Sequence, residues 1–447
     1  MLFLIVFFAF AGSAKADGSF DIVIYGATPS GITAAVSAAR AGSRVALIEP
    51  SYLIGGMMSG GLTKTDIGRT EAIGGLAREF YNRVHDYYVK TYGAESQQAF
   101  DCNGGYYFES KLALDLFGQM LADAHVTVVT KQLLQSVDVE HHQIISIRTS
   151  NTADQSSNTY AGKMFIDASY EGDLLAASHV MYRVGREARS EFNESLAGMT
   201  EGPEQYRGTG DQRVMAFNIR GGITDRPDLR LPFPKPTHYD ADASAGYIKT
   251  VLSHHYHTLH ELFPSANKWG NINGHFDSNS GDSPGINFAY ADADAEARQR
   301  IAQRVTDHWL SIWWGLQNDP ALPEEFRKDA LNWGVPKDEY MESNHVTPQI
   351  YVRECRRMLG QYFLTQRDLV SDRFKSDAIC MGNYGFDTHV VQLALADDGM
   401  LREGEISGST DLYDIPYRCL LPYGVDNLLV TVCVSASHVA YCSLRME

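Results

Sequence analysis

The chain has 447 residues, of which 44% are hydrophobic and 21% are charged, so it can bury a large core and does not have the composition of a disordered protein. The length predicts about two or three folding units. The formal net charge of −17 at pH 7, without any block of Lys or Arg, argues against a nucleic-acid-binding protein and against binding to anionic membrane surfaces.

The first residues predict export. Residues 1–16 form a short apolar run that ends in Ala14-Lys15-Ala16, which fits the pattern of a signal-peptidase site before Asp17. The alternative, a membrane anchor, is disfavoured because the run is shorter than the about 20 apolar residues that span a bilayer. We therefore expect a signal peptide at 1–16, a secreted or periplasmic mature protein and no stable membrane insertion.

Residues 20–49 predict a dinucleotide-binding unit. The expected elements are a strand at 20–25, an Ala-rich helix up to residue 41 and a strand at 44–48 that ends in Glu49. The turn between the first strand and the helix reads Gly26-Ala27-Thr28-Pro29-Ser30-Gly31. Backbone N–H groups at such a helix N-terminus bind a pyrophosphate, and Glu49 can accept hydrogen bonds from ribose hydroxyls. Thr28 stands where the dinucleotide fingerprint has its second glycine, but the surrounding elements support the prediction.

A second glycine cluster identifies the nucleotide. It follows Glu49 within a few residues, where an NAD domain continues with a plain crossover, and it reads Gly55-Gly56-Met57-Met58-Ser59-Gly60-Gly61. Paired glycines around two methionines allow close approach of the backbone to a flat apolar ring. The cluster predicts contact with the ribityl chain and ring of FAD; the alternative is a flexible surface loop.

Further elements follow in chain order. We expect strands at 126–130 and 136–148, the latter with a hairpin turn at 141–143, and at 163–168 and 428–434. A helix at 291–318 places Ile301, Val305, Trp309, Ile312 and Leu316 on one stripe, and its tryptophans are expected in the core rather than as a sugar platform. Thr347-Pro348 predicts the start of another helix, with an apolar stripe at Tyr351, Cys355, Met358, Leu359, Tyr362 and Phe363.

Several separated motifs carry a family resemblance. They are YGATPSGITAA at 25–35, GGMMSGGL at 55–62, FIDASYEGDLLAA at 165–177, YVRECRRMLGQY at 351–362, and IPYRCLLPYGVDNLLV followed by SASH within 415–438. With them the chain resembles the secreted FAD-dependent oxidoreductases of the two-dinucleotide-binding-domain flavoproteins, related to heterodisulfide reductase A-like flavoproteins. Relatives continue past the position of Glu447 into a glycine-containing helix that packs against the flavin, so the resemblance implies a domain truncated at that point.

The resemblance implies an α/β fold, a doubly wound Rossmann-like FAD/NAD(P)-binding sheet with an inserted mixed α+β cap domain. The FAD-binding domain is expected in two parts, at 17–183 and 345–447. The cap at 184–344 is rich in Pro, Gly, His and Trp and lacks strand alternation. The predicted cofactor-binding residues are Gly26, Ala27, Thr28, Pro29, Ser30, Gly31, Glu49, Pro50, Gly55, Gly56, Met57, Met58, Ser59, Gly60, Asp167, Ala168 and Asp173.

Neither the cysteines nor the histidines predict a metal. The six cysteines form no C-x-x-C pair, which argues against zinc, iron–sulfur and redox-dithiol sites and leaves disulfides and buried free thiols as alternatives. The histidines at 254–260 lack a Cys or carboxylate partner in pattern. Residues 277–282 begin like a calcium loop but place Asp282 where glycine is required.

Four residues are the candidates for catalysis. His389 and His438 lie in segments that match the flavin-facing regions of relatives, and either can act as the base that takes a substrate proton; a structural or FAD-orienting histidine is the alternative. On the expected helix, Arg353 and Arg357 lie one turn apart and can clamp a carboxylate or stabilise reduced flavin, whereas Arg356 is expected in solvated salt bridges. Asp387 could fix a histidine tautomer, and Glu354 could pair with Arg357.

These residues predict an FAD-dependent oxidoreductase that transfers a hydride from a small polar substrate, with a carbohydrate or polyol as the hypothesis. One alternative is a flavin-dependent hydroxylase, which needs a pyridine-nucleotide reductant. The other is a non-catalytic binding protein that retains the fold.

Overall fold

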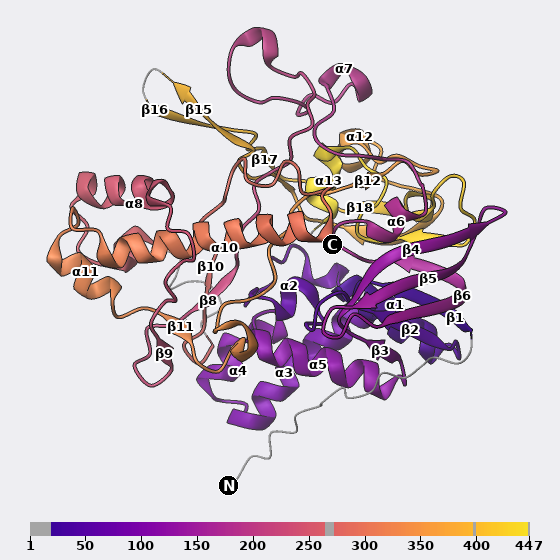
Figure 1. Cartoon of the computed structure of the whole chain (residues 1–447), viewed down its shortest axis with the longest axis horizontal. Helices are drawn as coiled ribbons and strands as arrows, with labels where there is room; N and C mark the ends of the chain where they lie inside the picture. The colour runs from indigo at the N-terminus through magenta and orange to yellow at the C-terminus, as the bar shows by residue number, and fades with distance from the viewer. Residues whose placement is uncertain (1–18, 264–271, 397–398, 446–447) are drawn as a thin grey trace.

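The computed structural model describes residues 19–263, 272–396 and 399–445. The signal peptide predicted at 1–16 lies outside them. Figure 1 shows a strand-rich part that contains β1 to β6 and, beside it, a helical part around α8, α10 and α11. Among the residues described, no helix combines the length and the apolar character that a bilayer span requires.

The central sheet has seven strands in the order β3-β2-β1-β6-β5-β4, and β19 also pairs with β6. The strands are β1 (Phe20–Tyr25), β2 (Val45–Ile48), β3 (Thr127–Val129), β4 (Gln132–Glu140), β5 (Gln143–Asn151), β6 (Ser157–Asp167) and β19 (Leu428–Val430). Strands β3, β2, β1, β6 and β19 are parallel, while β4, β5 and the first half of β6 form an antiparallel meander. The predicted Rossmann-like sheet is confirmed, and so is the hairpin turn after β4.

Both faces of the parallel strands are covered, which explains why β1 and β2 read as continuous apolar runs. On one face, Ile24 and Leu47 pack under the helices α1 (Pro29–Arg40), α3 (Gly75–Tyr92) and α5 (Ser110–Asp123). On the other face, Val23 and Ile48 pack against the β4–β5 meander and α6 (Asp173–Ala177). The strand β19 joins this core from the far end of the sequence, so the sheet is built from two separated parts of the chain.

The helical part surrounds its own core. Its elements are α8 (Ala241–His254), α9 (Leu259–Leu262), α10 (Ala295–Asn318), α11 (Glu324–Ala330) and the two-stranded pairs β8 (Gly221–Ile223) with β10 (Phe276–Ser278) and β9 (Arg230–Leu231) with β11 (Val335–Pro336). Asp294 caps α10 by accepting the N–H of Ala297 at 2.8 Å. The predicted stripe of α10 faces this core, and Trp309 and Trp313 are buried in it as expected.

The prediction of a helix that starts at Thr347 is wrong. Residues 347–363 run as an extended segment in which β12 (Arg357–Met358) pairs with β7 (Tyr182–Arg183). Their N–H groups bond to remote carbonyls, as Tyr351 does to Asn218 at 2.8 Å and Met358 to Cys433 at 3.0 Å. Tertiary pairing therefore overrides the helical periodicity, because remote carbonyls accept the hydrogen bonds that a helix would otherwise satisfy within the segment.

The C-terminal part forms a fourth core. It contains α12 (Gln366–Val370), α13 (His438–Leu444) and the strand pairs β13 (Ala378–Gly382) with β18 (Tyr413–Pro416), β14 (Phe386–Asp387) with β17 (Ser407–Gly408) and β15 (Gln392–Ala396) with β16 (Gly399–Glu403). Ala197 and Met215, from the segment assigned to the cap, share this core. The domain boundaries at 183 and 344 stay predictions.

We expect Trp309→Ala to lower the free energy of unfolding by about 3–5 kcal/mol, because it removes a buried aromatic side chain and leaves a cavity. Trp309 is fully buried, and its indole N–H donates to Ser278 Oγ at 3.1 Å. The matched control is Trp314→Ala, one turn along at a half-buried position of the same helix. Urea denaturation of both variants measures the difference; equal losses would contradict the assignment of Trp309 to the core.

Candidate functional site

The carboxyl ends of the parallel strands place the first predicted cofactor residues at one edge of the sheet. Gly26 directly follows β1, Glu49 follows β2, and Asp167 ends β6. Gly26 has φ +101°, and a Cβ added to it would lie 2.5 Å from the backbone nitrogen of Ser169. Only glycine fits there, because both the positive φ and the close backbone leave no room for a side chain.

Thr28 has a structural reason for standing in the place of a fingerprint glycine. Its hydroxyl donates to the carbonyl of Ala168 at 2.8 Å and accepts the N–H of Gly31 at 3.3 Å. It therefore caps α1 and ties the helix N-terminus to the end of β6. Pro29 occupies the first helical position, where its missing N–H costs no hydrogen bond, and Ser30 and Gly31 complete the first turn. This N-terminus provides an anion-binding end for phosphates.

Glu49 is held in place by its neighbours. Its Oε2 accepts the N–H of Ala27 at 2.8 Å, and its Oε1 accepts the N–H and hydroxyl of Ser51 at 2.9 and 2.8 Å. Burial raises the pKa of Glu49, while these bonds oppose the shift. The carboxylate thus lies beside the first glycine turn, and Pro50 follows it in the chain; the ribose contact of Glu49 stays a prediction.

The second glycine cluster packs against the first. Gly55 donates its N–H to the carbonyl of Ala27 at 2.7 Å, and the short helix α2 (Gly56–Ser59) follows. The N–H of Met57 donates to the hydroxyl of Tyr170 at 3.0 Å, and the carbonyl of Gly60 accepts from the hydroxyl of Thr347 at 2.9 Å. The cluster is therefore a defined turn rather than a loose loop, and it borders the extended segment that leads to Arg353.

Asp167 and Asp173 hold the loop after β6. Asp167 accepts the N–H groups of Ser169 at 3.0 Å and of Leu175 at 2.7 Å, and burial raises its pKa to about 6. Asp173 pairs with Arg298 at 2.8 Å and with Arg356 at 3.0 Å. The expectation of solvated salt bridges for Arg356 is wrong, because this side chain is buried where the loop, the cap and the extended segment meet.

His389 forms an ion-pair-like contact with a residue that the sequence did not assign to it. Its Nδ1 lies 2.8 Å from Asp282 Oδ2, whereas Asp387 Oδ2 lies 3.9 Å from Nε2. Arg353 and His389 hold the pKa of Asp282 low, at about 2, against its burial. Burial lowers the pKa of His389, and Arg353 lowers it further, so the ring is neutral at pH 7. An anionic Asp282 then fixes the proton on Nδ1 and leaves Nε2 as the proton acceptor.

The side chains around His389 form a closed ring, the His389 ring, which joins the C-terminal part to the cap. Arg353 sits over the aromatic face of Tyr351, and both belong to the extended segment. In order, the contacts are His389 to Asp282 (2.8 Å), Asp282 to Arg353 (3.1 Å), Arg353 to the Tyr351 ring centroid (4.5 Å), the Tyr351 hydroxyl to Arg445 (2.6 Å), Arg445 to Asp387 (3.4 Å) and Asp387 to His389 (3.9 Å).

His438 and Arg357 belong to a separate buried cluster. His438 Nδ1 lies 2.8 Å from Glu187 Oε2, and Nε2 accepts the N–H of Gly198 at 3.3 Å. Arg357 donates to Glu187 at 2.7 Å and to Glu354 at 3.1 Å, the latter pair as expected. Both ring nitrogens of His438 are engaged, which favours the structural alternative for this residue. Arg353 and Arg357 do not share a face, because the helix that would align them is absent.

The sequence missed Asp282, Glu187, Tyr351 and Arg445 as members of these clusters. Asp282 was considered only within a rejected calcium loop, and its partner His389 lies 107 residues away. Glu187 carried no motif at all. One chemical argument could have pointed to the missing carboxylates. A histidine and an arginine that are both predicted to be functional require a carboxylate partner from some other segment.

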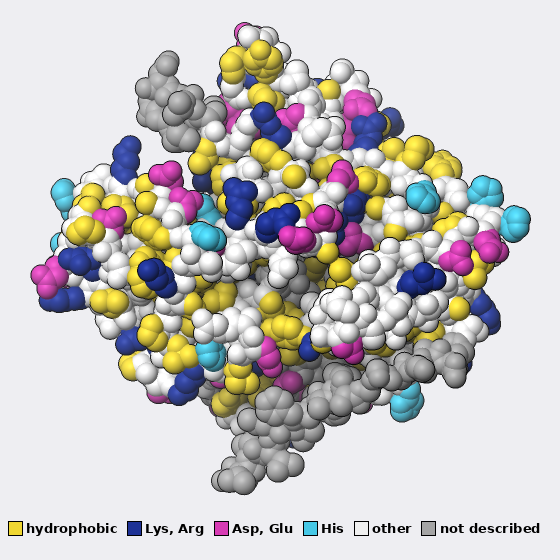
Figure 2. All heavy atoms as spheres, in the orientation of Figure 1, with side chains coloured by type: hydrophobic (Ala, Val, Ile, Leu, Met, Phe, Trp, Pro, Cys, Tyr) yellow, Lys and Arg dark blue, Asp and Glu magenta, His cyan; other side chains and the backbone are white. Residues whose placement is uncertain are grey.

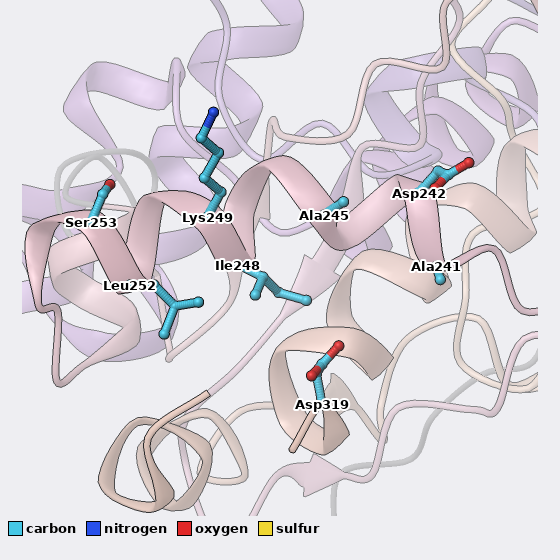
Figure 3. Close-up of a pocket in the computed structure, with 8 residues that line it drawn as sticks. All are labelled: Ala241, Asp242, Ala245, Ile248, Lys249, Leu252, Ser253 and Asp319. Carbon is cyan, nitrogen blue, oxygen red and sulfur yellow. The ribbon is translucent and has the colours of Figure 1, made fainter. Parts of the chain in front are cut away.

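Other hollows and clusters lie apart from this edge. A surface cavity of about 620 Å³ lies between α8 and the end of α10, where Ile248 and Leu252 point toward Asp319 and Lys249 points away (Figure 3). Glu109, His275 and Asp338 have the spacing of metal ligands. The ammonium of Lys111 lies 3.1 Å from Glu109 and contacts Asp338, so this lysine already supplies a positive charge to the cluster. Figure 2 shows acidic, basic and hydrophobic side chains intermixed on the face drawn.

A family model described as FAD dependent oxidoreductase matches residues 21–447. Among curated proteins, none matches the chain. Solved structures that are similar include the glycerol-3-phosphate dehydrogenase from Bacillus halodurans complexed with FAD, with 11% identity, a TM-score of 0.27 and coverage of 40% of this chain and 42% of that chain. THI4 from Thermovibrio ammonificans has 18% identity, a TM-score of 0.28 and coverage of 43% and 76%. This chain thus spans less than half the length of the first of these.

The residues at the carboxyl edge fit FAD. The backbone at Gly26 and Gly31 has no space for a Cβ, the N-terminus of α1 faces the edge, and Glu49 is fixed beside the turn. These features match the requirements of a pyrophosphate and an adenosine ribose. When bound, FAD supplies a two-electron acceptor.

We expect Gly26→Ala to weaken FAD binding by about tenfold or more, because the new Cβ would clash with the backbone of Ala168 and Ser169 at the phosphate turn. Gly42→Ala is the matched control, since Gly42 has a similar φ of +93° but open space around its Cβ. The flavin content of both purified variants and FAD titration of the apoproteins measure the effect. Equal FAD affinity in the two variants would rule out the proposed close approach.

Glu187→Gln is expected to lower the free energy of unfolding by about 3–5 kcal/mol, because it leaves Arg357 and His438 buried with reduced charge compensation. Glu191→Gln, which alters an exposed pair with Arg183, is the control and should change stability little. Thermal or urea unfolding compares the two. A Glu187 variant as stable as the control would show that this cluster does not hold the C-terminal core together.

Proposed function

Because this chain belongs to the FAD dependent oxidoreductase family and its cofactor is FAD, we propose that it oxidises the alcohol of a small polar substrate by hydride transfer to the flavin. A carbohydrate or polyol is the proposed substrate class. The observation that carries the proposal is the 2.8 Å contact between Asp282 and His389, a residue pair that orients a neutral imidazole as a base.

The chain's own residues supply the proton transfer. His389 Nε2 accepts the proton of the substrate hydroxyl. Bound FAD would take up the hydrogen of the same carbon with its electron pair, so that the alcohol would become a carbonyl. Asp282 stabilises the imidazolium that forms, because it stays anionic under the influence of Arg353. The second glycine cluster connects this ring of residues to the cofactor edge, through Thr347 and the segment that carries Tyr351 and Arg353.

Two finer predictions accompany this proposal. The pattern at 1–16 supports export, so the enzyme would act outside the cytoplasm, where a pyridine nucleotide is seldom met. The motif likeness supports a place near the heterodisulfide reductase A-like flavoproteins without iron–sulfur motifs. Export also makes a flavin hydroxylase the weaker alternative, since a hydroxylase needs such a reductant.

Anaerobic mixing with a panel of sugars and polyols tests the proposal. Loss of the visible absorption of oxidised flavin on adding one of them would support an alcohol oxidase or dehydrogenase, without requiring any electron acceptor. Reduction by NADH or NADPH alone would instead support a hydroxylase. Protein that binds a sugar without flavin reduction would support a non-catalytic binding protein.

We expect His389→Gln to slow the anaerobic reduction of flavin by substrate about 10²- to 10⁴-fold, the usual contribution of a positioned base. The visible spectrum of oxidised flavin should be unchanged, because the residue lies outside the cofactor edge. His254→Gln, at an exposed position of α8, is the control. A His389 variant that reduces flavin at the wild-type rate would exclude the base role and turn attention to His438.

The rate of flavin reduction should fall only at a pH below the ordinary pKa of a histidine, because burial lowers the pKa of His389 and the base is lost when it is protonated. Asp282 raises the pKa of His389, whereas burial, Arg353 and Arg445 lower it. Asp282→Asn should therefore move the midpoint to a lower pH and reduce the limiting rate. Stopped-flow pH profiles of both proteins test this, and a midpoint that moves upward would contradict the assignment.

A further inference from the structure

Arg353 is a buried cation whose donors lack acceptors. Its side chain is 0% exposed, and within the described residues none of its three guanidinium nitrogens has a hydrogen-bond partner. Its contacts are the ion pair with Asp282 and the face of Tyr351. Burial lowers the pKa of Arg353, and nearby Arg445 and Arg220 lower it further, yet a guanidinium stays protonated in proteins. Asp282 balances the charge of this group, but its N–H donors still call for oxygen acceptors, because buried donors without acceptors are costly.

Asn218 presents a second unmatched group on the same side. Its residue is 0% exposed, and both Nδ2 and Oδ1 lack partners in the part of the chain that the structure describes. Its backbone pairs with Tyr351 in an antiparallel bridge, so the two side chains point to the same side, as does Arg353 two residues on. Asn218 Oδ1 also lies 4.0 Å from the Cβ position of Gly281, next to Asp282.

The unmatched groups lie directly behind the proposed base. One carboxylate, Asp282, contacts His389 through one oxygen and Arg353 through the other. Within the His389 ring, the side chains of Asp387 (37%), His389 (24%) and Asp282 (14%) are accessible to solvent and Tyr351 is half-buried, whereas Arg353 is 0% exposed. A ligand that enters from solvent therefore meets these side chains first and Arg353 behind them.

We propose that Arg353 and Asn218 form a carboxylate subsite, so that the substrate is a hydroxy acid of the sugar-acid type rather than a neutral sugar or polyol. The inference rests on the proposed function and narrows its substrate class. The planar guanidinium can bind both oxygens of a carboxylate, and Nδ2 of Asn218 provides a further donor. Oδ1 of Asn218 is then left to accept from a hydroxyl of the same substrate.

The reaction leaves the carboxylate unchanged. The hydroxyl proton goes to His389 Nε2. Bound FAD would take the hydrogen of the carbinol carbon as hydride, and the product would be an oxo acid. Arg353 and Asn218 hold the substrate at the end opposite to the alcohol, so they determine which molecules reach the base rather than take part in the proton transfer.

Carbon-matched pairs of ligands test the proposal on the flavin-loaded protein: gluconate against sorbitol, and glycerate against glycerol. Binding is followed by the perturbation of the oxidised-flavin spectrum, and turnover by its anaerobic loss. We expect the acids to bind and at least one to reduce the flavin, with their neutral partners inactive. Reduction by sorbitol or glycerol alone would uphold the proposed function and overturn the carboxylate subsite. Binding of acids without reduction would uphold the subsite and overturn the proposed function, and no binding of any acid would overturn the subsite.

Variants separate substrate recognition from effects on flavin or folding. Arg353→Gln should weaken acid binding about 10- to 100-fold, the value of charge-assisted hydrogen bonds, and Arg353→Lys should restore part of it. Asn218→Asp keeps the shape of the side chain but adds a negative charge that repels the acid, so it should weaken acid binding as well. It replaces Arg353→Gln as the test if that variant does not fold. The control is Arg300→Gln, which alters an exposed pair on α10. A ligand-free flavin spectrum altered by Arg353→Gln, with acid affinity unchanged, would assign Arg353 to the flavin and overturn the proposal.

Discussion

The parallel pairing of β6 with β1 on one side and β19 on the other is the constraint on which the rest of this protein depends. Phe165 and Asp167 are in register with Val23 and Tyr25, and also with Leu428 and Val430. This pairing brings the start, the middle and the end of the chain to one sheet edge. Close contact of Gly26 with Ala168 and Ser169, and the hydroxyl of Thr28 on Ala168, then fix the phosphate turn relative to that edge.

Buried charge organises the second half of the molecule. Arg353, Arg356 and Arg357 all lie in one extended segment, and each meets an acid from a different place: Asp282, Asp173 and Glu187. Removing such charges from water is costly unless each has a partner with good geometry. The segment is therefore held at the junction of the cofactor sheet, the cap core and the C-terminal core. Arg353 differs from its two neighbours in that its contact with Asp282 provides no hydrogen bond, and this difference underlies the proposed subsite.

The arrangement links the proposed base to the cap. Asp282 comes from the cap segment, His389 from the C-terminal part, and Arg353 from the extended segment between them, so neither part alone forms the His389 ring. The glycine clusters contact the same extended segment through Thr347 and Gly60. The proposed subsite and the cofactor edge are therefore joined by one segment of the chain.

Local sequence patterns were enough to predict the short elements and the cofactor. The strand, glycine turn, helix and acid at 20–49, the meander and the stripe of α10 were predictable because periodicity and turn residues over short stretches of sequence indicate them. Thr28 departs from the glycine of the sequence motif, and its hydrogen bond to the carbonyl of Ala168 explains why a threonine stands there. Other features depend on contacts between distant segments. The extended state of 347–363, the burial of Arg356, the Asp282–His389 pair and the separation of Arg353 from Arg357 all arise from pairing between segments far apart in the chain. No local pattern indicates such pairing, because the partner of each charged side chain lies in a distant segment that becomes its neighbour only when the sheet and the cap have folded.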